Sequence, residues 1–184
     1  MRRFILAAAM VAGLAIPAAA DVLLFAPDRL LEAVEYNDIK LVQSLLARGY
    51  NPDSVDSDGR TALIVAAIAG NDEMVEMVLK YRANCDKKDK VGNAALGYAA
   101  TRGHVGVTEL LLEKGADVDV ENQQGMTPLM LAASEGRLGV MRLLIEHKAE
   151  IDVSDFTGRT AMMWAQRSGK KSAVRVLREA GAKE

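Results

Sequence analysis

Residues 125–133 read Gly-Met-Thr-Pro-Leu-Met-Leu-Ala-Ala, and the pattern of this stretch returns along the chain at a spacing of 33 residues. Apolar, alanine and glycine positions on either side keep the same spacing. A period of this length predicts a repeat architecture, in which stacked units bury a face that no single unit can bury alone. The clearest columns are Gly59, Gly92, Gly125 and Gly158; Gly70, Gly103, Gly136 and Gly169; Leu63, Leu96, Leu129 and Met162; and Val78, Leu111, Leu144 and Leu177.

Each internal unit carries the signals of two short helices. The glycine at the start of the pattern favours a turn with positive φ, and a threonine two residues later favours a helix N-cap. In the second unit this predicts a helix over 62–69 that starts after Thr61 and ends at Gly70. A second helix, capped by Asn71 or Asp72, then places apolar residues on one face at helical spacing.

The third unit departs from the pattern. Asn93-Ala94 replaces the capping threonine, and Gly97 falls inside the first helix. A glycine in a helix interior costs about 1 kcal/mol relative to alanine. We therefore expect residues 92–104 to form the softest internal part of the array.

Residues 125–133 resemble the ankyrin signature, and Leu110–Asp119 resemble the segment that closes an ankyrin repeat. Residues 30–53 are similar to an N-terminal capping repeat. The resemblance implies an all-α repeat solenoid of stacked helix-turn-helix units with β-hairpin-like finger turns. It divides residues 21–184 into about five repeats: 25–57, 58–90, 91–123, 124–156 and 157–184. It also implies a structural role for His104.

The N-terminus has the pattern of a secretory signal peptide over residues 1–20. Arg2 and Arg3 precede an apolar run, and Ala18-Ala19-Ala20 offers small residues for cleavage after Ala20. The run is short for a membrane span, although an uncleaved anchor is the alternative interpretation. We expect an exported protein, periplasmic or secreted, with no membrane association after cleavage.

Composition narrows the function classes. The formal net charge is −2, so no global basic field favours nucleic acid. Neither of the two histidines has a second ligand at metal spacing, and Asp117 and Asp119 lack the pattern of a calcium loop. We find no catalytic set, and we expect no enzyme activity, no cofactor and no metal. The lone Cys85 has no internal partner and is interpreted as a half-buried filler.

Charge is uneven along the chain. Residues 21–58 hold eight acidic and three basic residues, whereas residues 155–184 hold three acidic and seven basic residues. A partner would therefore meet an acidic start and a basic end. The basic residues of the last unit are interpreted mainly as a solvated cap, with a basic docking edge as the alternative.

The resemblance implies that binding occurs through the finger turns and the inner, concave face of the first helices. Phe156 is either a solvent-facing anchor or a side chain folded back on the cap. We expect an otherwise monomeric chain that binds another protein, which it would inhibit, protect or stabilise; the alternatives are a secreted effector that binds host proteins and a self-assembling scaffold. The candidate contact residues are Tyr36, Arg60, Lys90, Asn93, Arg102, Gln123, Met126, Glu135, Phe156, Arg159 and Arg167.

Overall fold

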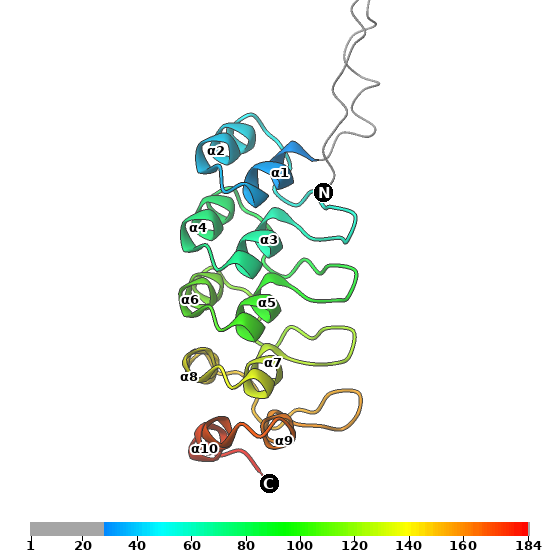
Figure 1. Ribbon diagram of the computed structural model, residues 1–184, viewed down its shortest axis with the longest axis vertical. Coiled ribbons are helices and arrows are strands. Elements are labelled where there is room, and N and C mark those ends of the chain that lie inside the picture. The colour runs from blue at the N-terminus through cyan, green and yellow to red at the C-terminus, as the bar shows by residue number, and fades with distance from the viewer. Residues whose placement is uncertain (1–27, 184) are drawn as a thin grey trace, which may run out of the picture.

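The computed structural model describes residues 28–183, which form a row of five helix pairs. The helices of this region are α1 (Arg29–Glu35), α2 (Ile39–Ala47), α3 (Ala62–Ala69), α4 (Asp72–Lys80), α5 (Ala95–Arg102), α6 (Val105–Glu113), α7 (Pro128–Glu135), α8 (Leu138–Glu146), α9 (Ala161–Arg167) and α10 (Lys171–Glu179). The first helices of the pairs stack in one row and the second helices in another (Figure 1). This arrangement confirms the predicted all-α repeat solenoid.

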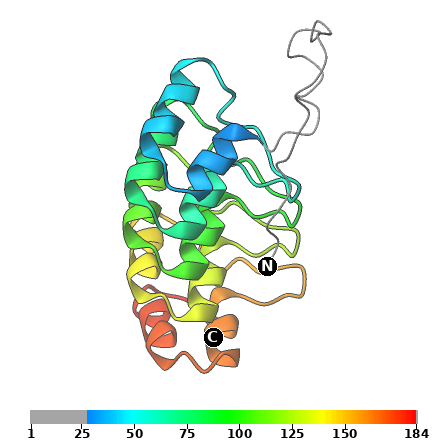
Figure 2. The ribbon, with the colours of Figure 1, turned by 45° about the horizontal axis from the view of Figure 1, so that its top comes forward.

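A hairpin loop, here called a finger, projects before each of the helices α3, α5, α7 and α9. The four fingers, residues 55–61, 88–94, 121–127 and 154–160, all point to the same side of the helix rows (Figure 2). Isolated antiparallel bridges close the first finger between Val55 and Thr61 and the last between Ser154 and Thr160. The predicted signal peptide, residues 1–20, lies outside the described residues, as do residues 21–27.

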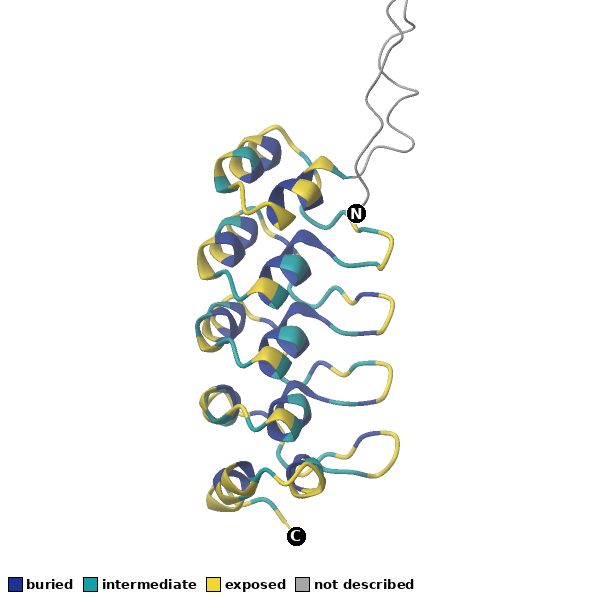
Figure 3. Cartoon of the chain, viewed as in Figure 1, coloured by how far each residue is buried: buried dark blue, intermediate teal, exposed yellow. Residues whose placement is uncertain are grey.

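The core runs between the two helix rows and between successive pairs, with exposed residues concentrated on fingers and outer turns (Figure 3). One column shows how the repeat builds it. At each position the side chain is at most 1% exposed, and full burial of such a side chain contributes about 1.5–3 kcal/mol. The members of this column are Leu30, Leu63, Leu96, Leu129 and Met162.

The predicted caps are confirmed in the second, fourth and fifth pairs. The hydroxyl of Thr61 accepts a hydrogen bond from the backbone N–H of Ile64 at 3.2 Å, and Thr127 and Thr160 make the equivalent bond at 3.4 Å. Gly70 ends α3 with a left-handed φ of 69°, and Asn71 caps α4. The predicted helix over 62–69 coincides with α3.

Helix α5 lacks this cap, as the sequence predicts. Ala94 occupies its N-cap position without a side-chain hydrogen bond, and Gly97 lies buried inside the helix. A Cβ added to Gly97 would lie 3.4 Å from Cδ1 of Leu131, which is ordinary van der Waals contact. The site therefore has room for alanine.

We expect Gly97→Ala to raise the free energy of unfolding by about 1 kcal/mol through its higher helix propensity. Ala94→Thr should add a further ~1 kcal/mol by restoring the missing cap. Urea unfolding measures both changes. In the unsubstituted chain, hydrogen exchange should be faster in residues 92–104 than in α3 or α7; strongest protection there would contradict the expectation.

Neighbouring units are also joined by a column of aspartates. Each carboxylate accepts a hydrogen bond from a backbone N–H 31 residues further along, in the loop that follows the next helix pair, at 2.9–3.0 Å. This aspartate column consists of Asp53, Asp86, Asp119 and Asp152, which bind the N–H groups of Asn84, Asp117, Glu150 and Lys183 in that order.

Candidate functional site

The base of every finger is closed by one acidic or amide side chain. Its Oδ1 atom accepts hydrogen bonds from the backbone N–H groups two and four residues later, at 2.8–3.0 Å. Such a side chain fixes the turn by satisfying two donors that a short hairpin leaves unpaired. The four residues that do this are Asp56, Asp89, Asn122 and Asp155.

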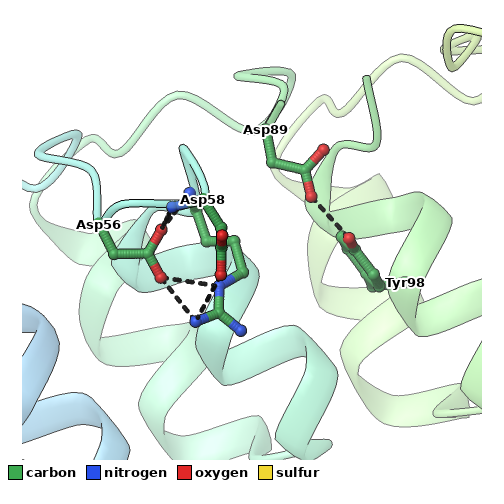
Figure 4. Close-up of polar contacts among 5 residues, drawn as sticks. Asp56, Asp58, Asp89 and Tyr98 are labelled. Carbon is green, nitrogen blue, oxygen red and sulfur yellow. Dashed lines mark hydrogen bonds and ion pairs between the residues drawn. The ribbon is translucent and has the colours of Figure 1, made fainter. Parts of the chain in front are cut away.

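In two units the second carboxylate oxygen ties the finger to the helix that follows it. Oδ2 of Asp89 accepts from the hydroxyl of Tyr98 at 2.6 Å (Figure 4), and Oδ2 of Asp155 accepts from the indole N–H of Trp164 at 2.9 Å. Tyr98 and Trp164 occupy equivalent positions of the repeat. We call this finger-to-helix hydrogen bond the finger latch.

The other two fingers are held by different side-chain contacts. In the second unit, Val65 occupies the position of Tyr98 and has no hydrogen-bond donor in its side chain. The guanidinium of Arg60 binds Asp56 at 2.7 Å instead and lies 3.6 Å from the carboxylate of Asp58 (Figure 4). In the fourth unit, the amide of Asn122 donates instead to Oδ1 of Asn93 at 3.1 Å. Each finger is therefore held by side chains at its base.

The hydrogen bonds at the base of the last finger lower the pKa of the Asp155 carboxyl group. Burial alone would raise the pKa of Asp155, but hydrogen bonds from Thr157, Arg159 and Trp164 outweigh burial and hold the pKa at about 2, below the ordinary 3.8. Because the folded-state pKa is depressed, the ionised carboxylate stabilises the fold above pH 3.8. This contribution is lost as the pH falls from about 4 towards 2.

We expect Asp155→Asn to lower the free energy of unfolding at pH 7 by about 1–3 kcal/mol. Asparagine closes the finger at Asn122, so the turn survives, but an amide N–H₂ facing the indole N–H of Trp164 leaves both donors unpaired. The stability lost between pH 4 and pH 2 should also shrink.

Asp89→Asn is the matched control for this prediction. Its partner Tyr98 carries a hydroxyl that can accept as well as donate, so the latch can reverse direction. Denaturant unfolding at pH 7 and at pH 3 compares the two variants, and equal losses at both positions would contradict the donor argument.

Neighbouring fingers are hydrogen-bonded to each other. The N–H of Lys90 donates to the carbonyl of Asp58 at 3.0 Å, and the N–H of Phe156 donates to the carbonyl of Gln124 at 3.1 Å. Between them, the side chain of Gln123 donates to the carbonyl of Lys90 at 2.9 Å. The finger tips therefore form a connected row along one side of the solenoid.

The two aromatic candidates are the most exposed large apolar side chains of the described region. Tyr36 is 78% exposed at the end of α1, and Phe156 is 74% exposed on the last finger. The ring of Phe156 lies against Gly125 of the preceding finger, where an added Cβ would come within 2.6 Å of it. Phe156 is thus a solvent-facing side chain supported by its neighbour, rather than one folded back on the cap.

The charged and polar candidates divide into two groups. Those that are exposed are Lys90, Arg102, Gln123, Glu135 and Arg167. Those that are half-buried are Arg60, Asn93, Met126 and Arg159. Arg159 donates to the hydroxyl of Thr157 at 2.6 Å and lies over the Trp164 ring, 5.4 Å from its centroid. Together with Arg60, it serves first to hold its own finger.

A further column of first-helix residues was missing from the predicted surface. Val65, Tyr98, Leu131 and Trp164 are half-buried where the fingers meet the first helices. Their spacing of 33 residues could have revealed the column, and an aromatic donor nine residues after a finger aspartate could have revealed the latch.

At the start of the array, α1 and the first finger enclose a groove of about 510 Å³. The exposed side chains of Tyr36 and Val55 line it together with Glu32 and Glu35. The acidic beginning of the chain and the Tyr36 candidate therefore lie at one surface.

Cys85 and His104 both lie against neighbouring parts of the array. Cys85 is half-buried against the core, and burial raises the pKa of its thiol. Nε2 of His104 lies 3.3 Å from the carbonyl oxygen of Ile68 in the preceding unit. Within residues 28–183, no cluster of three or more acidic, histidine or cysteine side chains could hold a metal ion, and no helix is long and apolar enough to cross a membrane.

The family model described as ankyrin repeats (3 copies) matches residues 30–122 and also residues 114–184, so that together the two matches span nearly all of the described chain. No curated protein matches the sequence closely enough to count as a relative.

Proposed function

Because the chain belongs to the ankyrin-repeat family, whose repeats form protein–protein interaction modules, we propose that it is an exported protein that binds one cognate protein of the cell envelope. Binding uses the finger tips and the exposed side of the first helices. The proposal joins the signal-peptide pattern of residues 1–20 to the finger row of the described region.

The observation that carries the proposal is the contrast between the base and the tip of each finger. The base is held by the same pair of backbone hydrogen bonds in all four units, whereas the tip residues at one position are Ser57, Lys90, Gln123 and Phe156. A fixed frame loses little conformational entropy when a partner binds, so variable tips on such a frame favour specific recognition.

Affinity capture with the purified protein, using envelope extract as the source of partners, tests this surface. We expect Phe156→Ala to reduce the amount of captured partner about tenfold or more, because an exposed aromatic on a rigid support is a typical anchor residue. Val105→Ala is the control: Val105 is 44% exposed but lies in α6, in the row of second helices. Equal capture by both variants would argue against the finger row.

Cell fractionation separates the proposed location from the effector alternative. Retention of the protein in the periplasm favours a partner in the producing cell, which the bound chain would inhibit, protect or stabilise. Recovery of the processed protein in the medium favours binding of host proteins instead.

A further inference from the structure

Four columns of the repeat are buried in the first four units, with one half-buried member, and become more exposed in the last. They are Leu31, Ile64, Gly97 and Met130; Val34, Ala67, Ala100 and Ala133; Val42, Val75, Thr108 and Met141; and Leu46, Leu79, Leu112 and Ile145. The last described unit continues these columns as Met163, Gln166, Val174 and Arg178, which no other unit within residues 28–183 covers. We call the outer surface of α9 and α10 that they form the end face.

The end face is only partly converted into a polar cap. Gln166 and Arg178 replace apolar residues, as the solubility of a terminal repeat requires. Met163, however, remains apolar and is 43% exposed, whereas Met130 at the same position is fully buried. Val174 is half-buried where Met141 is fully buried. An apolar strip thus persists where a stacking element would cover it.

A hollow of about 420 Å³ borders this strip between α9 and α10, where Gln166, Gly169, Lys171 and Val174 line it. A second hollow, of about 450 Å³, lies at the boundary with the fourth unit, between Glu135, Gly136 and the start of α10. At three earlier unit boundaries a side chain of the following unit covers the equivalent glycine: an added Cβ on Gly136 would lie 3.1 Å from Lys170. Gly169 has nothing within 4 Å of an added Cβ, so this position is open.

The charge of the end face is positive. Lys170 and Lys171 stand at the start of α10, where the positive end of the helix dipole adds to their charge, and Arg167 and Arg178 lie on α9 and α10. Lys170 makes no side-chain cap hydrogen bond with the helix. Carboxylates placed here would be attracted by both the lysines and the backbone N–H groups of the first turn.

We propose that the end face is a second docking surface, which binds an acidic amphipathic helix of a partner protein. The apolar face of that helix would cover Met163 and Val174, and its carboxylates would meet Lys171, since the side chain of Lys170 lies against Gly136 of the preceding unit. The partner helix would pack on α9 and α10 in the place that the first helix of an additional repeat would occupy. This surface is separate from the finger row and does not depend on it.

A second copy of the chain is a poorer occupant. Helix α1 carries Arg29 in the column that the later units fill with the smaller, buried Ala62, Ala95, Pro128 and Ala161. Stacking α1 on the end face would place this large side chain where the array has small ones, at a cost from overlap. A partner helix with a small residue at this position avoids that cost.

The test uses a synthetic amphipathic peptide of about 18 residues, long enough to form a helix, with leucine and alanine on one face and glutamate on the other. A matched peptide carries lysine in place of every glutamate. The single tryptophan of the chain, Trp164, lies in α9 beside Met163, so its fluorescence reports binding to the purified protein. We expect the acidic peptide to bind, more weakly at high salt, and the basic peptide to bind at least about tenfold more weakly.

Two variants locate the site. Met163→Glu and Lys171→Glu should each weaken acidic-peptide binding about tenfold. Their controls are Val105→Glu, at an equally exposed apolar position, and Lys40→Glu, in the first turn of α2 at the other end of the array. The controls should bind as the unsubstituted chain does.

The proposal is overturned if the acidic peptide does not bind, if the two peptides bind equally, or if the controls weaken binding as much as the end-face variants. Sedimentation of the protein alone checks the remaining occupant: concentration-dependent self-association that Met163→Glu abolishes would assign the end face to a second copy. Capture of an envelope partner through Phe156 is unaffected by any of these results, so the two proposals fail separately.

Discussion

Leu129→Ala should lower the free energy of unfolding by about 2–5 kcal/mol, the range for removing a fully buried leucine side chain. Leu129 is 0% exposed and lies in α7, between the neighbouring helices α5 and α9. The substitution leaves a cavity in the fourth unit, and a stack of units held by nearest-neighbour contacts cannot close it without moving both neighbours. Urea unfolding followed by circular dichroism measures the loss.

The same substitution should also broaden the transition. Weakening one internal unit of a linear array uncouples the units on either side, so that the two parts unfold at different urea concentrations. Val91→Ala is the control, because Val91 is 50% exposed on a finger and its truncation should cost less than about 0.5 kcal/mol. A single sharp transition with a loss below 1 kcal/mol at Leu129 would contradict the burial argument.

Gly92→Ala is expected to have the second-largest effect, a loss of about 2–4 kcal/mol. Gly92 adopts a φ of 81°, which costs an alanine about 1–2 kcal/mol. An added Cβ would also lie 2.6 Å from the backbone N of Gln123 in the next finger, too close for any Cβ. Because the obstacle is backbone, the two fingers would have to separate, at a further cost of about 1–3 kcal/mol.

Gly158→Ala separates these two contributions. Gly158 has the equivalent position in the last finger and a similar φ of 78°, but nothing lies within 4 Å of an added Cβ. We expect this variant to lose only the conformational part. Thermal unfolding of the two variants side by side measures the energy of finger stacking as their difference, and equal losses would mean that stacking contributes little.

The sequence was sufficient for the fold because its signals are local and repeated. Thr61, Thr127 and Thr160 precede apolar helical segments and cap them in the structure. Gly70, Gly103 and Gly136 end the helices α3, α5 and α7 in a left-handed conformation. The absence of a side-chain cap at Ala94 could likewise be predicted from the sequence. Each of these features depends on residues within one turn of one another.

The surface was harder to predict because the direction of a long side chain depends on its neighbours. Arg60 and Arg159 both follow a finger glycine and look like exposed contacts in the sequence. Arg60 binds Asp56 because Val65 cannot donate a hydrogen bond to that carboxylate. In the last unit Trp164 donates a hydrogen bond to Asp155, and Arg159 stacks on the Trp164 ring instead. An arginine at the same position of the repeat therefore has different partners, and the residue on the following helix, Val65 or Trp164, decides which.

The aspartate column gives the array a unit of length. Each carboxylate reaches a backbone N–H that lies 31 residues later, so the bond at every boundary is interchangeable with the next. Deletion or duplication of a whole 33-residue segment, such as 91–123, would rejoin Asp86 or its equivalents to a correctly placed donor. A change of one residue more or fewer inside a helix would instead shift the later positions of that helix out of their columns. We therefore expect insertions and deletions that include helices to be tolerated in whole periods, each of which adds or removes one finger.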